Sequence, residues 1–338
     1  MRGDSDLIPL LKANLQHLHS GKVRETFLLG RFGDFVLLLV YVSDRLSAYD
    51  FVLGFSVPMK GIVLSTKNLM AREHLPADIP QDLVASGVGI DEYLHEYPQL
   101  QGIPELQARC LVVQKLEMIP REIICRGALT GNGFKTYNQT GQLCGHKPLP
   151  GLRDGQLLGV PLFTPTTKGK DGEHDEFVDA FETEKLYPGI TEFGMRVYRE
   201  VHALHFEHGI FMADTKFEIG RVWKQGKPYF VLADEVGTPD SSRFWMWLEY
   251  QNVWPRELPR SWDKDPARRW LVRAASDQGF DLGTLDPKNK DDVARVKTLI
   301  PPDDVLTRIA DGYIQTVHMM GPTLESFWTE RGVNLFGA

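Results

Sequence analysis

The chain has 338 residues, 42% of them hydrophobic and 25% charged, so we expect a globular protein with a large core rather than a disordered one. Its formal net charge of −7, without any block of Lys or Arg, argues against a nucleic-acid-binding protein, so local basic clusters should bind small anions. The longest apolar run, 35–42, is too short to cross a membrane, no signal pattern opens the chain, and the three Cys form no metal or disulfide pattern; we expect a cytoplasmic protein.

The segment Gly21 to Val42 predicts a β-meander, because its apolar runs are separated by glycine-containing turns. Gly21-Lys22-Val23-Arg24 stands immediately before the first strand. A glycine there lets backbone N–H groups approach a phosphate, and Lys22 and Arg24 add positive charge, so the turn is a candidate phosphate cradle. The same pattern is common in solvated turns, and no GxxxxGK[ST] motif accompanies it.

Ser43-Asp44-Arg45 follows the end of the apolar strand, where loops gather polar groups that contact ligands. The alternative is that Ser43 or Asp44 caps a helix. A helix is expected over 67–74, before Pro76, and a strand over 108–116. We therefore place the end of a first lobe near Leu116, which divides the chain into 1–116 and 117–338.

Two segments pair an arginine with small residues. Arg126 is followed by the glycine-rich turn 130–133, which contains Asn132, and Arg243 follows Asp240 and Ser242. A guanidinium beside such a turn can grip a phosphate with side-chain and backbone donors together. Each segment alone is more often a turn with a surface arginine, but the two together indicate a phosphorylated small molecule.

The middle of the chain is irregular over 146–170, where Pro, Gly and Thr are frequent, and is then expected to be helical over 186–208. Between them, 172–176 concentrates acidic residues around His174. Such a run is generally an exposed acidic tip, although it could contribute to a metal or substrate site. His174 is not expected to bind zinc.

Residues 210–220 alternate strictly, so Asp214, Lys216 and Glu218 should project from one face of a half-buried strand. A turn at 224–227 and a second apolar strand at 229–236 complete a hairpin. Two carboxylates and a lysine suit a magnesium–nucleotide site. A two-residue turn favours Glu235 on the face of Glu218, whereas a slip of one residue favours Asp234. The alternative is an amphipathic strand with a solvated charged side.

Eight segments, taken in order from Gly21 to about Trp270, resemble the SAICAR synthetase family. They are GKVRETF, VSDRLSAYD, PMKG, EMIPREIICRGALTGNGF, PLFTPTTKGKDGEHDE, GIFMADTKFEIG, LADEVGTPDSSRFW and SWDK. The resemblance implies a two-lobed α+β fold. A small β-rich N-terminal lobe, 1–116, would bind ATP against a larger mixed lobe, 117–338, which carries the metal and ribotide sites and C-terminal helices that pack back.

The resemblance also implies a reaction, with ATP and Mg²⁺ as cofactors. ATP phosphorylates the carboxylate of 5-amino-1-(5-phospho-D-ribosyl)imidazole-4-carboxylate (CAIR), and the amine of L-aspartate displaces phosphate to give the succinocarboxamide SAICAR, in purine biosynthesis. The alternatives are a paralogue that acts on a related azole ribotide carboxylate, a catalytically silent nucleotide-binding regulator, and a phosphotransferase without a ligase step.

The roles implied for single residues follow the matched motifs. The phosphate-contacting turn is Gly21, Lys22 and Arg24; the magnesium ligands are Glu218 and Asp234; the ribotide-binding residues are Arg126, Asn132, Asp240, Ser242 and Arg243; the residues beside the reacting carboxylate are Asp214 and Lys216; and the loop near the expected aspartate pocket is Ser43, Asp44 and Arg45. The motif match favours Asp234 over Glu235. The chain departs from the family at Asn132, where Ser is usual, and at Met59, Arg121 and Ile219.

Overall fold

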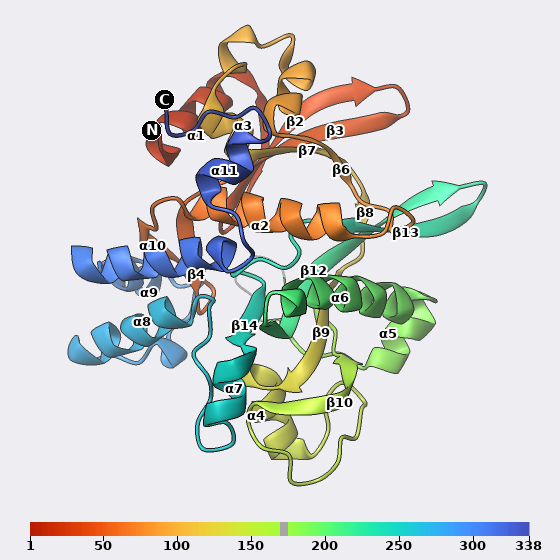
Figure 1. Ribbon diagram of the computed structural model, residues 1–338, viewed down its shortest axis with the longest axis vertical. Coiled ribbons are helices and arrows are strands. Elements are labelled where there is room, and N and C mark those ends of the chain that lie inside the picture. The colour runs from red at the N-terminus through yellow and green to blue at the C-terminus, as the bar shows by residue number, and fades with distance from the viewer. Residues whose placement is uncertain (170–174, 338) are drawn as a thin grey trace. The chain divides into compact units, whose positions relative to one another are not determined.

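The computed structural model describes residues 1–169 and 175–337 and confirms the mixture of helices and strands expected of an α+β protein (Figure 1). The chain forms two compact units, each made of separate stretches. Unit 1 contains Met1–Lys67, Asp82–Lys115 and Lys264–Ala338, and unit 2 contains Asn68–Gln81 and Leu116–Asp263. The division into domains 1–116 and 117–338 remains a proposal. In the described part of the chain, no helix has the length and apolar character that crossing a membrane requires.

Unit 1 is built on a five-stranded antiparallel sheet with the order β1-β2-β3-β7-β6. Its strands are β1 (Gln16–Ser20), β2 (Arg24–Phe32), β3 (Phe35–Val42), β6 (Leu83–Ser86) and β7 (Cys110–Gln114). The predicted β-meander is confirmed: β2 turns into β3 at Gly33, whose φ of 60° favours glycine. A second, two-stranded sheet joins β4 (Arg45–Ala48) to β5 (Phe51–Ser56).

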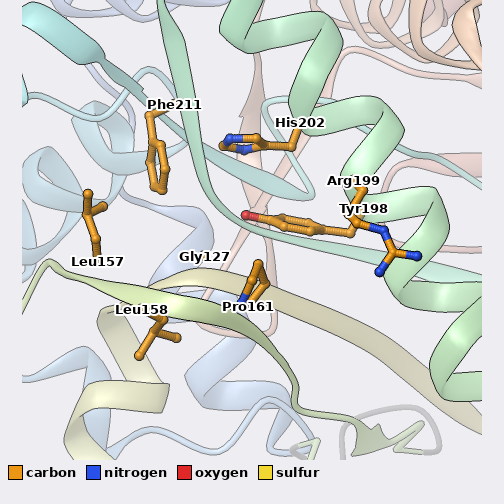
Figure 2. Close-up of a pocket in the computed structure, with 8 residues that line it drawn as sticks. All are labelled: Gly127, Leu157, Leu158, Pro161, Tyr198, Arg199, His202 and Phe211. Carbon is orange, nitrogen blue, oxygen red and sulfur yellow. The ribbon is translucent and has the colours of Figure 1, made fainter.

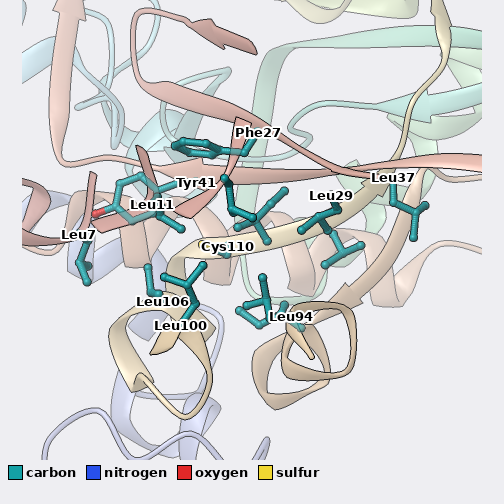
Figure 3. Packing of buried hydrophobic residues seen from close by; sticks show 14 residues of the cluster. Leu7, Leu11, Phe27, Leu29, Leu37, Tyr41, Leu94, Leu100, Leu106 and Cys110 are labelled. Atoms are coloured by element: carbon teal, nitrogen blue, oxygen red, sulfur yellow. The ribbon is translucent and has the colours of Figure 1, made fainter. Parts of the chain in front are cut away.

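The core of unit 1 lies between this sheet and the short helices beside it (Figure 3). Leu7 and Leu11 of α1 (Asp4–Asn14) and Leu106 of α3 (Pro104–Arg109) pack against Phe27 and Tyr41 of the sheet, and all five side chains are fully buried. Burying a large apolar side chain contributes about 1.5–3 kcal/mol, so this cluster holds β2 and β3 firmly in place. The strands therefore offer a rigid support for the turn that precedes β2.

The helices of unit 1 include four near the C-terminus. They are α8 (Asp265–Asp277), α9 (Lys290–Lys297), α10 (Asp303–His318) and α11 (Leu324–Thr329). The predicted helix over 67–74 is longer than expected: α2 spans Lys60–His74 and runs from unit 1 into unit 2. Trp328 of α11 is 1% exposed and donates a hydrogen bond to Thr66 of α2, so the last helix packs against this one.

Unit 2 is built on a seven-stranded sheet whose main path is β10-β9-β12-β13. The strands are β8 (Glu117–Met118), β9 (Arg121–Leu129), β10 (Gln156–Phe163), β11 (Thr166–Thr167), β12 (Ile210–Lys224), β13 (Lys227–Ala233) and β14 (Ser242–Met246). The hairpin predicted at 224–227 is confirmed as a two-residue turn, with Lys224 opposite Lys227. The long helix α6 (Ile190–Glu207) packs on β12 and β9 (Figure 1).

Two expectations for unit 2 were wrong in detail. The segment 146–170 contains β10 and β11 rather than being wholly irregular, because its apolar residues pair with β9 on either side of a bulge at 158–161. The helix expected over 186–208 is two helices, since Pro188 and Gly189, at φ 90°, separate α5 (Ala180–Leu186) from α6.

Candidate active site

Three strands of unit 2 place an acid between two arginines. In the antiparallel register, Asp214 of β12 lies opposite Arg126 of β9 on one side and opposite Arg243 of β14 on the other. Both guanidiniums donate to the same oxygen, Oδ2 of Asp214, and the bond from Arg126 measures 2.5 Å. Two charged donors thus converge on one carboxylate oxygen, and such paired guanidiniums are suited to binding an anion.

Asp214 is buried, which corrects the expectation of a half-buried strand with a solvated charged face. Asp214 is 5% exposed and Arg126 is 4% exposed, because β12 is a central strand, covered on both faces along its first half. Burial lowers the pKa of Arg126, although Asp214 opposes that effect. A second hydrogen bond, 3.0 Å from Nε of Arg126 to the Thr164 hydroxyl, fixes the guanidinium.

The glycine-rich turn touches both arginines. Gly131 and Gly133 open α4 (Gly131–Thr140), and a Cβ at Gly131 would lie 2.6 Å from Nη2 of Arg243, while one at Gly133 would lie 3.0 Å from Nε of Arg126. Glycine is therefore required here for the helix N-terminus to approach the guanidiniums. Because a helix N-terminus presents unpaired N–H groups, it adds donors for an anion beside the two arginines.

The other predicted ribotide residues lie around this cluster. Ser242 exchanges a 2.8 Å hydrogen bond with the Thr215 hydroxyl, and Asp240 lies in the turn that the bond from Ser242 N to Thr238 O closes. Asn132 is exposed in the first turn of α4, and its side chain forms no hydrogen bond to any other residue of the ranges 1–169 and 175–337.

Lys216, two residues along β12 from Asp214, projects from the same face of the strand. Its ammonium group donates to Glu122 of β9 at 2.5 Å. Burial, together with a hydrogen-bonded contact with Asp175, raises the pKa of Glu122 to about 7, against the opposing effect of Lys216. Burial alone would lower the pKa of Lys216, but Glu122 outweighs it and the pKa is raised. The lysine therefore stays charged at neutral pH.

The hairpin of β12 and β13 has a two-residue turn, but its second strand ends before Asp234 and Glu235. The turn has two residues and places Glu218 opposite Ala233, which is the register that favours Glu235. The strand ends at Ala233, however, and Asp234 adopts a φ of 58°, so regular alternation stops there. Burial raises the pKa of Glu218, and the negative charge of Asp234 raises it further. The negative charge of Glu235, by contrast, raises the pKa of Lys216. Asp234 and Glu235 thus both lie near the charged face of β12.

Glu218 and Asp234 fit a magnesium site in their chemistry. Their carboxylates repel each other through space, as the raised pKa of Glu218 shows, and a divalent cation would relieve that repulsion. In the structure, Lys168 lies 2.5 Å from Oε2 of Glu218 and partly supplies this positive charge. Within 1–169 and 175–337, no group of three or more His, Cys, Asp or Glu side chains could hold a metal ion. Any magnesium would therefore depend on oxygens of substrate and water.

A cavity lies on the opposite face of this sheet. An apolar cavity of about 190 Å³ is lined by eight residues: Gly127, Leu157, Leu158, Pro161, Tyr198, Arg199, His202 and Phe211 (Figure 2). Gly127 follows Arg126 in β9, so the two project to opposite faces. Tyr198 donates to the carbonyl of Met212 at 3.0 Å and fixes α6 to β12. The charged cluster thus has a rigid apolar support behind it.

In unit 1, the predicted basic turn Gly21 to Arg24 leads into β2. The ammonium group of Lys22 lies 2.5 Å from Oδ1 of Asp50, and both side chains are partly exposed. Ser43 and Arg45, predicted to lie near an aspartate pocket, contact the carbonyl groups of this turn.

Asp44 is engaged differently from its two neighbours. Arg109 donates two hydrogen bonds to its carboxylate, at 2.7 and 2.9 Å, and the Gly61 N–H donates another at 2.8 Å. Arg109 is 2% exposed, so this bidentate pair is buried. The geometry gives Asp44 a structural role in unit 1.

The sequence analysis missed Glu122, Lys168 and Thr164, which complete the charged cluster of unit 2. Glu122 had a usable signal, because it alternates with Arg126 along β9 and so shares its face. Lys168 and Thr164 belong to a segment predicted as irregular, where no alternation indicates direction. Residues 172–174 of the predicted acidic tip, His174 among them, lie outside the described part of the chain.

Comparisons with known proteins identify the family of the chain. The model of the SAICAR synthetase family matches residues 17–281. A phosphoribosylaminoimidazole-succinocarboxamide synthase from Streptomyces coelicolor is 40% identical over 285 residues, which are 82% of this chain and 87% of the relative. One from Thermobifida fusca is 39% identical over 83% of this chain and 86% of its own length.

Among solved structures, SAICAR synthase from Saccharomyces cerevisiae complexed with SAICAR superposes with a TM-score of 0.73 at 30% identity. The superposition covers 95% of this chain and 97% of the yeast chain. The family model, the relatives and the fold all agree, and the chain belongs to the SAICAR synthetase family.

Proposed function

We propose that this protein is the ATP-dependent ligase that condenses CAIR with L-aspartate to give SAICAR, ADP and phosphate in purine biosynthesis. Its relatives carry the name of this synthase, and the yeast structure at 30% identity holds SAICAR. The observation that carries the proposal is the charged face formed by β9, β12 and β14, on which Arg126, Arg243 and Lys216 lie together. We place the reaction in the cytoplasm, where ATP and aspartate are available.

The ribotide phosphate is assigned to the arginine pair. Arg126 and Arg243 both donate to one carboxylate oxygen, and the N-terminus of α4 lies against both guanidiniums. Ser242 supplies a hydroxyl beside Arg243, and Asp240 and Asn132 lie on the turns that flank the pair. Bidentate donors fix orientation as well as charge, which is what a phosphate anchor needs in order to position a distant carboxylate.

The reacting carboxylate is assigned to Lys216, with Asp214 orienting the arginines beside it. Phosphoryl transfer needs positioning and charge neutralisation more than a protein nucleophile, so a charged lysine held by Glu122 at 2.5 Å suits the task. Glu218 and Asp234 would hold Mg²⁺, which supplies further neutralisation of phosphate charge when bound. Nucleotide phosphates are assigned to Gly21, Lys22 and Arg24.

One observation favours a second candidate substrate. Asn132 stands where the family usually has Ser, and it is exposed beside the arginine pair. A related azole ribotide carboxylate would then replace CAIR while the ligase chemistry stayed the same. Turnover with such a ribotide but not with CAIR would establish this alternative.

The assignment of the arginine pair is tested by kinetics of Arg243→Gln. Removing one of two charged donors to a phosphate costs about 1.5–3 kcal/mol, so KM for CAIR should rise at least tenfold while KM for ATP stays within about twofold. Arg199→Gln is the matched control, because Glu192, at 2.8 Å, is the one ion-pair partner of Arg199 among residues 1–169 and 175–337, and the pair lies on the surface of the same unit. A larger effect on KM for ATP than on KM for CAIR would contradict the assignment.

A further inference from the structure

The turn Gly21 to Arg24 has an asymmetric hydrogen-bond pattern. Three of its carbonyl groups accept hydrogen bonds: Gly21 from Arg45, Val23 from Ser43, and Arg24 from both Gly21 and Arg45. The backbone N–H groups of Lys22 and Val23, by contrast, donate to no backbone or side-chain group among residues 1–169 and 175–337. Three carbonyl groups of the turn are therefore occupied while the N–H groups of Lys22 and Val23 are available, which is the polarity of an anion-binding backbone nest.

Two side chains from the same short stretch create this polarity. Ser43 is fully buried and approaches Val23 O twice, with its N–H at 2.9 Å and its hydroxyl at 2.8 Å. Nη2 of Arg45 reaches Gly21 O at 3.1 Å and Arg24 O at 3.3 Å. These bonds reach carbonyl groups at both ends and in the middle of the turn, so they fix the conformation of its whole backbone.

Arg45 is itself anchored from behind. Its Nη1 donates to Glu25 at 2.6 Å, and Glu25 is 1% exposed and also accepts from Ser20 and from His17. Burial tends to raise the pKa of Glu25, but these three hydrogen bonds outweigh it and the pKa is lowered. The anchor is therefore a carboxylate at neutral pH, and it holds the guanidinium against the carbonyl groups of the turn.

We infer that Ser43 and Arg45 are positioning residues for nucleotide phosphate: they hold the carbonyl groups of the turn away, so that its N–H groups and the side chains of Lys22 and Arg24 face the anion. This inference rests on the proposed function, which assigns the nucleotide phosphates to this turn. It gives Ser43 and Arg45 a role other than the aspartate pocket to which the family motif pointed.

The test measures Kd for ATP, ADP and adenosine, with Arg45→Lys and Ser43→Ala compared with the wild-type protein. A lysine keeps the charge but cannot bond two carbonyl groups and a carboxylate together, so Kd for ATP and ADP should rise about tenfold. Kd for adenosine, which has no phosphate, should stay within about twofold, a difference that general loosening of the protein would not produce. Ser43→Ala should weaken ATP in the same selective manner.

Arg31→Gln is the matched control, because Arg31 is exposed on the same strand, β2, and should leave all three affinities unchanged. Equal weakening of adenosine and ATP, or unchanged ATP affinity in both variants, would overturn the inference. Should Arg45→Lys fail to fold, the single-oxygen deletion Ser43→Ala decides by the same criterion. Lys22→Ala distinguishes failure of the inference from failure of the proposed function. If Lys22→Ala weakens ATP binding while Ser43→Ala and Arg45→Lys do not, the inference fails and the assignment of the nucleotide phosphates to the turn stands. If none of the three variants weakens ATP binding, that assignment itself fails.

Discussion

Removing the negative charge of Asp214 should destabilise the charged cluster in unit 2. Asp214→Asn keeps the shape of the side chain but removes the charged carboxylate oxygen to which both Arg126 and Arg243 donate. Removing one partner of a buried ion pair costs about 3–5 kcal/mol. Arg126 is 4% exposed, but the side chain of Arg243 is 27% exposed, so solvent screens part of the repulsion. We expect a loss of about 3 kcal/mol in the stability of unit 2.

Hydrogen exchange measures this loss where it occurs. Amides of β9, such as those of Ile123 and Cys125, are buried in the sheet that Asp214 joins, so their exchange should become roughly a hundredfold faster in the variant. Adding Arg126→Met to Asp214→Asn removes the uncompensated buried charge and should recover part of the stability, since the two changes are coupled. Wild-type exchange in Asp214→Asn would refute the view that this carboxylate balances two arginines.

A matched control uses an ion pair of the same type on the surface of the same unit. Arg196 lies 2.6 Å from Asp78, whose side chain is 70% exposed. Exposed pairs of this kind contribute little to stability. Asp78→Asn should therefore leave β9 exchange unchanged; faster exchange in this control as well would show that loss of any acid loosens the sheet.

Three further outcomes follow from the same geometry. Glu218→Gln should abolish magnesium-dependent ADP release while the melting temperature stays within about 2 °C of wild type; unchanged turnover would remove the metal assignment. Because burial raises the pKa of Glu122 to about 7 from an ordinary 4.5, the folded protein binds this proton more tightly and loses stability as pH rises through that window. Between about pH 5 and pH 8, the ligand-free wild type should thus lose melting temperature relative to Glu122→Gln, and a constant difference would contradict the burial argument. Gly131→Ala places a Cβ 2.6 Å from the Arg243 guanidinium at a φ of +59°, so KM for CAIR should rise about tenfold with KM for ATP unchanged; equal effects on both would contradict it.

Periodicity predicted the elements that carry the site better than it predicted their surroundings. The alternation at 210–220 indicated β12, and the turn residues at 224–227 indicated the hairpin with β13; both are confirmed. The burial of Asp214 could not be predicted, because it results from β14 and β9 pairing on either side of β12. Those pairings join residues far apart in sequence, and a single strand pattern contains no information about them.

At the hairpin and at Asp44, sequence-based prediction failed for other reasons. The turn residues left the register open between Glu235 and Asp234, and the left-handed backbone at Asp234, where regular alternation stops, is not visible in any alternation pattern. At Asp44, the motif indicated a ligand-facing loop. The buried partner Arg109 lies 65 residues further along the chain, where nothing local indicates an ion pair.

The measurement that tests the central claim most directly is ADP release with CAIR, L-aspartate and Mg-ATP, with each component omitted in turn and the product identified by mass. The proposed function predicts that ADP release depends on all of them and that the product is the succinocarboxamide SAICAR. ATP binding without amide formation from CAIR and aspartate would contradict the proposed substrate, and ADP release that continues without aspartate would contradict the ligase reaction itself.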